Sequence, residues 1–138
     1  MNKKDLPTTF GIFKPVGHTL IAFHTTAELT SAQADLARLG FEQDSMVLYS
    51  DTEMLAQVDK ELEHVSPMAN FGYELDLIHI HRELAQDGCC FLVVKADTDA
   101  LEKLVSDMVR SIKPASAQQY GHFMIEDLTE KPPGRVQA

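Results

Sequence analysis

The stretch that decides the fold is residues 17–49, GHTLIAFHTTAELTSAQADLARLGFEQDSMVLY. Its first residues, 17–24, form an apolar run that predicts a strand, and the string from Thr25 to Glu28 is a capping box that begins a helix. Apolar residues then recur at helical spacing until Gly40, which is typical of a helix end. Residues 44–49 predict another strand. The stretch therefore predicts a strand–helix–strand unit.

The same order returns near the C-terminus. Residues 89–96, CCFLVVKA, predict a buried strand, and Asp97 or Thr98 begins an amphipathic helix that Lys113-Pro114 ends. Residues 117–126 predict a last strand. Two such halves in one antiparallel sheet predict an α+β protein, namely a ferredoxin-like split βαβ sandwich. A helical pair inserted between the two halves, at about 51–87, replaces the short link expected there.

The domain organisation follows from the length of 138 residues, which fits one domain. We expect an N-terminal extension at 1–16, a single ferredoxin-like domain at 17–128 and a disordered tail at 129–138.

The predicted strands are apolar on both faces. In 20–23, for example, Leu20 and Ala22 alternate with Ile21 and Phe23. A four-stranded sheet with helices on one side only would alternate apolar and polar residues. Either the inserted helices fold across the second face, or a second chain covers it in a homodimer with face-to-face sheets.

Composition and charge exclude several classes of function. The formal net charge is −9, which opposes binding to nucleic acid or to an anionic membrane surface. We find neither a membrane-spanning apolar run nor the apolar region of a signal peptide, so we expect a cytoplasmic protein. The only two cysteines, Cys89 and Cys90, are neighbours and cannot form a disulfide framework.

Three strings together resemble a known family: AQADLARLGFEQDSMVLYS at 32–50, HRELAQDGCCFLVVKADTDALEKLVSDMV at 81–109 and SAQQYGHFMIEDL at 116–128. The chain is similar over about residues 17–128 to the small bacterial general-stress-protein domains. The resemblance implies the ferredoxin-like fold and a stress-related setting. It implies no catalytic residue.

Residues 72–84, GYELDLIHIHREL, raise the question of a metal site. As a helix, this stretch has Tyr73, Leu77, Ile80 and Leu84 on its apolar side, with His81 at the edge.

On the far side of the same helix, Asp76 and Glu83 lie three residues before and four residues after His79. This trio could hold a metal ion if another element supplied a ligand. One helix supplies too few ligands, and such a trio is more often a solvated, ion-paired surface. We therefore expect no metal ion and no cofactor.

The remaining candidates are at strand ends. His18 and His24 share one face of the first strand, and Tyr120 and His122 share one face of the last. In the ferredoxin-like order these strands are neighbours, so the four residues, with Lys95, could line a small pocket. The simpler interpretation is that the strand-end histidines meet solvent.

These observations favour a non-enzymatic cytoplasmic module that is homodimeric and acts through a protein partner or a small ligand. The alternatives are a small enzyme of the dimeric α/β-barrel type, with His18, His24, Tyr120 and His122 as acid–base or orienting groups, and a weak metal binder through Asp76, His79 and Glu83.

Overall fold

The computed structural model describes residues 8–9, 12–13, 15–64, 73–121, 125–129 and 135–137. Its elements, in chain order, are β1 (Thr8–Thr9), β2 (Ile12–Phe13), β3 (His18–Phe23), α1 (Thr26–Arg38), the 3₁₀ turn η2 (Gln43–Ser45), β4 (Met46–Tyr49), α2 (Asp51–His64), α3 (Tyr73–Gln86), β5 (Cys90–Lys95), α4 (Asp99–Ile112), β6 (Ser116–Tyr120), β7 (Ile125–Asp127) and β8 (Arg135–Gln137). The α+β class predicted from the sequence is confirmed.

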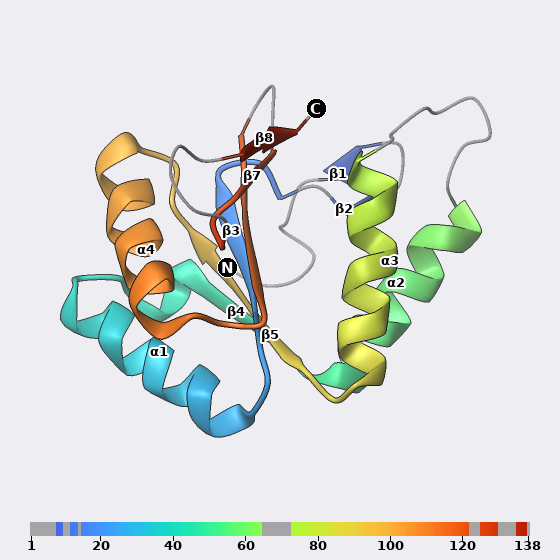
Figure 1. Cartoon of the computed structure of the whole chain (residues 1–138), viewed down its shortest axis with the longest axis horizontal. Helices are drawn as coiled ribbons and strands as arrows, with labels where there is room; N and C mark the ends of the chain where they lie inside the picture. The colour runs from blue at the N-terminus through green and yellow to red at the C-terminus, as the bar shows by residue number, and fades with distance from the viewer. Residues whose placement is uncertain are drawn as a thin grey trace.

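The main sheet has six strands in the order β4-β5-β3-β6-β7-β8, and every neighbouring pair is antiparallel. The central strand β3 pairs with β5 on one side and β6 on the other, and all six of its residues are buried. Strands β1 and β2 pair with each other in a small separate sheet, and β2 contacts α2. Figure 1 shows α1 and α4 on one side of the main sheet and α2 and α3 on the other.

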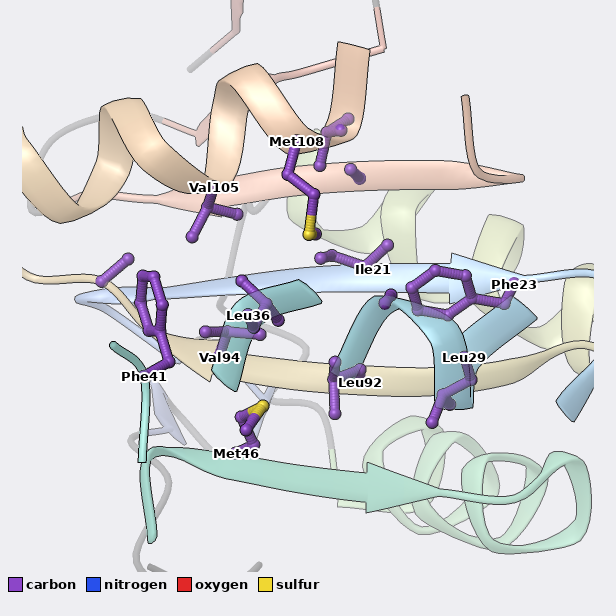
Figure 2. Packing of buried hydrophobic residues seen from close by; sticks show 14 of the residues in the cluster. Ile21, Phe23, Leu29, Leu36, Phe41, Met46, Leu92, Val94, Val105 and Met108 are labelled. Carbon is purple, nitrogen blue, oxygen red and sulfur yellow. The ribbon is translucent and has the colours of Figure 1, made fainter. Parts of the chain in front are cut away.

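Helices α1 and α4 cover what we call the α1/α4 face of the sheet. Both begin at caps that the sequence indicates: Thr25 and Glu28 form the expected capping box, and the Thr98 side chain accepts from the backbone N–H of Leu101. Figure 2 shows their apolar side chains meeting those of the strands. The buried residues of this core are Ile21, Phe23, Leu29, Ala32, Leu36, Phe41, Met46, Leu92, Val94, Ala96, Val105, Met108, Val109, Ala117 and Leu128.

Helices α2 and α3 cover the opposite side, the α2/α3 face. Ser50 and Glu53 form the predicted capping box at the start of α2. The buried residues of the second core are Leu20, Ala22, Val47, Tyr49, Met54, Val58, Leu77, Ile78, Ala85, Cys89, Phe91, Val93, Tyr120 and Ile125. Of the two coverings considered for this face, the structure has the inserted helical pair of the same chain.

The prediction of one last strand at 117–126 is wrong. The chain reverses after Tyr120, and β6 and β7 are antiparallel neighbours in which Tyr120 lies opposite Ile125. The rule that every second side chain shares a face therefore cannot be applied from Tyr120 onward through the predicted strand at 117–126.

Strand β8, Arg135–Gln137, pairs with β7 and lies in the stretch for which we expect a disordered tail. The rest of that stretch beyond residue 129, and residues 1–7 of the expected N-terminal extension, lie outside the described residues. Among the helices that the structure describes, none is long and apolar enough to cross a membrane.

Candidate functional site

The candidate site is a group of buried polar side chains on the α2/α3 face. We call it the polar layer, and it consists of His18, Tyr49, Glu61, His81, Gln118 and Tyr120, each at most 8% exposed. Strands β3, β4 and β6 contribute four of them, and α2 and α3 contribute one each.

Glu61 lies in the buried stripe of α2. Met54 and Val58 precede it by seven and three residues, so the three side chains share one side of the helix. Gln57 Nε2 donates a hydrogen bond of 3.1 Å to Glu61 Oε1. Burial, and then the carboxylates of Glu61 and Glu53, raise the pKa of Tyr49 to about 12. The phenol of Tyr49 therefore stays protonated at neutral pH and can only act as a neutral hydrogen-bonding group.

His81 lies in the middle of the contact between α3 and the sheet. Its Nε2 donates to Gln118 Oε1 on β6 at 3.0 Å, and its ring meets Phe91 on β5 edge to face, with centroids 5.9 Å apart and an interplanar angle of 80°. Burial lowers the pKa of His81 to about 4, against a smaller raising effect of the bond to Gln118. His81 is therefore neutral at neutral pH.

The apolar side of α3 predicted from the sequence, which includes Ile80 and Leu84, differs from the observed side by a shift of about one residue. The buried residues are Leu77, Ile78, His81 and Ala85, whereas Ile80 is 41% exposed. The helix packs along the row 77, 81 and 85, which puts the histidine on the sheet and turns Ile80 outward. The hydrogen bond from His81 to Gln118 compensates for burying the imidazole.

Two of the predicted catalytic candidates lie together. His18 on β3 is directly opposite Tyr120 on β6 and Lys95 on β5, so the three occupy one row of the sheet. His18 is buried, with Nδ1 donating to Val16 O at 3.0 Å, whereas Lys95 is exposed. The predicted His–Tyr–Lys row therefore exists, but its histidine does not meet solvent.

The other two candidates do not join this row. His24 is exposed and follows the far end of β3, about 20 Å from His18 along the strand. His122 lies outside the described residues.

The metal candidates Asp76, His79 and Glu83 are all exposed on α3. Within the described residues, no group of three or more His, Cys, Asp or Glu side chains could hold a metal ion. The trio predicted from helical spacing is therefore not such a group.

The vicinal cysteines point to opposite faces, as the strand predicts. Cys89 packs in the α2/α3 core, and Cys90 packs beside the α1/α4 core, where its Sγ lies 3.4 Å from Thr25 O. Burial is the largest cause that raises the pKa of each thiol. Both therefore favour the thiol form, which is the less reactive one.

The α1/α4 face contains different polar groups. Thr19 donates to Gln119, and Gln119 Nε2 donates to Ala96 O at 3.1 Å. These side chains are uncharged and buried. On its outside, two open hollows run along the seam between α1 and α4 and share Ile112, with Leu39, Leu104 and Met108 lining the larger one.

The polar layer combines a neutral imidazole, a protonated phenol and a buried carboxyl side chain. These three kinds of side chain can exchange protons with a substrate only if the substrate reaches them. Here they are packed among apolar side chains beneath two helices, and the contacts described above go to other side chains or to the backbone.

The sequence interpretation missed Glu61 and His81 as buried groups. Glu61 follows Met54 and Val58 at helical spacing, and this spacing was the signal that could have placed it on the sheet. His81 was assigned to the edge of an apolar side rather than to its centre.

Comparison with models of known protein families, with curated proteins and with solved structures finds no match for this chain. The arrangement of its own residues therefore carries the functional argument.

Proposed function

We propose that this chain is a non-enzymatic interaction module with a ferredoxin-like fold. The strand order β4-β5-β3-β6 supports the fold, because the first and last strands of the two strand–helix–strand halves, β3 and β6, are neighbours as that plan requires. The resemblance to general-stress-protein domains suggests a stress-related role, and we place the protein in the cytoplasm as its sequence leads us to expect.

The observation that carries the proposal is the packing of the α2/α3 face. Leu20 and Ala22 on β3 and Phe91 and Val93 on β5 are at most 1% exposed. They lie against the buried side chains of α2 and α3 in one core. Side chains of the same chain thus occupy the surface on which a barrel-type enzyme would build its pocket.

The alternative of a dimeric α/β-barrel enzyme needs a free sheet face on each of two chains. The helical pair takes that place here, which counts against this alternative (Figure 1). The homodimer remains part of the proposal, but it would have to form through another surface. Sedimentation equilibrium tests it: the mass of two chains is expected, and the mass of one chain would remove the dimer.

Thermal unfolding of the full chain with a panel of divalent metals, nucleotides, haem, flavin and common metabolites tests the absence of a small-molecule site. We expect an unchanged midpoint with every compound. A ligand at one hundred times its dissociation constant would stabilise the folded state by about 2.7 kcal/mol and raise the midpoint by several degrees.

A specific shift of that size would overturn the proposal. The matched variants Tyr120→Phe and Tyr49→Phe would then show where the ligand binds. Loss of the shift in Tyr120→Phe alone would point to the row containing His18, and loss in Tyr49→Phe alone would point to the region of Glu61.

A further inference from the structure

His81 connects the inserted helical pair to two strands of the sheet at once. It belongs to α3, donates to Gln118 on β6 and packs its ring against Phe91 on β5. The side chain is 4% exposed, although it lies in a core otherwise made largely of apolar residues. A single titratable group therefore lies at the centre of the contact that holds α3 to the sheet.

A positive charge on His81 would meet little compensation at this position. The titratable or charged groups that face this layer from the elements around it are His18 of β3, Tyr49 of β4, Glu61 of α2, Cys89 just before β5, Lys95 of β5, Tyr120 of β6 and Asp127 of β7. On α3 itself, Arg82 pairs with Asp59 of α2 across a half-exposed contact of 3.4 Å.

None of these groups offsets the cost of placing a positive charge on the buried ring of His81. Loss of water is the largest influence on its pKa, which falls to about 4, and the only opposing influence is the neutral amide of Gln118. Burying an ionised group without an ionic partner is costly, so the protonated imidazole favours a state in which water reaches it.

The α1/α4 face has its own core on the other side of the sheet. The buried polar side chains described there are the uncharged Thr19 and Gln119. The charge that protonation places on His81 would therefore lie in the α2/α3 core and not in the α1/α4 core.

We propose that His81 is a proton-sensitive latch: its neutral form holds the α2–α3 pair on the sheet, and its protonation releases α3 and uncovers the apolar α2/α3 face. The inference goes beyond the proposed function, because it gives the domain a conformational change that depends on pH. It stands on the position of His81 between α3 and the strands β5 and β6.

The sign of the effect follows from the two states. When α3 is docked, the pKa of His81 is about 4; when α3 is released, the imidazole returns toward its ordinary value of 6.5. The released state therefore binds the proton more tightly, and its population rises as the pH falls from about 6.5 toward 4. Between about pH 7 and pH 5 the release equilibrium should increase by roughly 20-fold.

Amide hydrogen exchange of the full chain at about pH 7 and pH 5, corrected for the intrinsic exchange rates, tests the latch. In the wild-type protein we expect the opening constant of peptides covering 73–86 to rise about 20-fold, while that of peptides covering 90–95 rises much less. An equal rise in both segments would overturn the latch, because it would mean that acid opens the whole domain.

Two variants on the same helix sharpen the test. In His81→Gln, which has no titratable group at that position, the pH-dependent rise should disappear; in His79→Gln, where the replaced histidine is exposed, it should remain. Retention of the rise in His81→Gln would also overturn the proposal. If His81→Gln does not fold, the test rests on the wild-type protein alone, through the comparison of the opening constants of 73–86 and 90–95.

Discussion

Each face of the sheet has its own apolar core, but the two faces contain different buried polar groups. The α1/α4 face contains the uncharged pair Thr19–Gln119, whereas the α2/α3 face contains the imidazole of His81 and the carboxyl group of Glu61. Among the buried polar side chains of the two faces, the pH response is expected on the second face, through His81. The comparison teaches that one sheet can have a core whose buried polar groups are uncharged on one side and a conditional core, which contains the titratable His81, on the other.

The largest expected effect comes from opening a cavity in the α1/α4 core. Leu36 is fully buried, and Leu36→Ala should lower the free energy of unfolding by about 2–5 kcal/mol. Leu39→Ala, at the C-cap of the same helix, is the matched control: Leu39 is 45% exposed, so its substitution should lower the free energy of unfolding much less. Denaturant unfolding measures both, and equal effects would contradict the described packing of α1.

The next effect is the pH dependence contributed by His81. Its pKa is lowered from 6.5 to about 4, so the unfolded chain takes up the proton first as the pH falls. The contribution of the neutral His81 to the free energy of unfolding is fully present above pH 6.5. It is lost progressively down to about pH 4, by roughly 3 kcal/mol in total.

Unfolding curves of wild type and His81→Gln across this range isolate that contribution. The difference in unfolding free energy between the two proteins should change with pH. A difference that stays constant from pH 7 to pH 4 would show that His81 is not buried in its neutral form.

A smaller effect is expected from the partner of His81. Gln118→Leu keeps the size of the side chain but removes the acceptor of the His81 hydrogen bond, and it should destabilise the fold by about 1–3 kcal/mol. Gln118→Leu combined with His81→Leu should recover part of this loss, because neither side chain then leaves a buried polar atom without a partner. A double-mutant cycle by denaturant unfolding gives the coupling, and additive losses would contradict the contact.

The smallest effect compares the helix caps of the two faces. Thr25→Ala removes the cap of α1 on one side, and Ser50→Ala removes the cap of α2 on the other. Each should cost about 1 kcal/mol. Hydrogen exchange distinguishes them: Thr25→Ala should loosen α1 only, and Ser50→Ala should loosen α2 only. Loosening of both helices by either variant would indicate that the two faces are not independent.

Local chemistry allowed much of the fold to be predicted. The capping boxes at Thr25 and Ser50 form as expected, and the left-handed Gly40 follows the end of α1 with φ at 103°. These features depend on residues close together in the chain. The alternation of side chains in β3 and β5 was also predicted, because it depends only on strand geometry.

The features that the sequence did not reveal depend on contacts between distant elements. The reversal after Tyr120 occurs where strand pairing, rather than the apolar pattern, determines the path of the chain. The burial of His81 depends on which row of α3 meets the sheet, and its compensation comes from Gln118, 37 residues away. His18 and Tyr120 were predicted as neighbours because that prediction used the strand order of a fold, not local propensity.

The most direct test of the difference between the two faces is the pKa of His81, measured by NMR titration of the imidazole resonances in the full chain. His79, exposed on the same helix, serves as the internal reference. A pKa near 4 for His81 would agree with a neutral imidazole buried between α3 and the sheet. A pKa near the ordinary value of 6.5 would show that water reaches the side chain and would contradict both the conditional core and the latch.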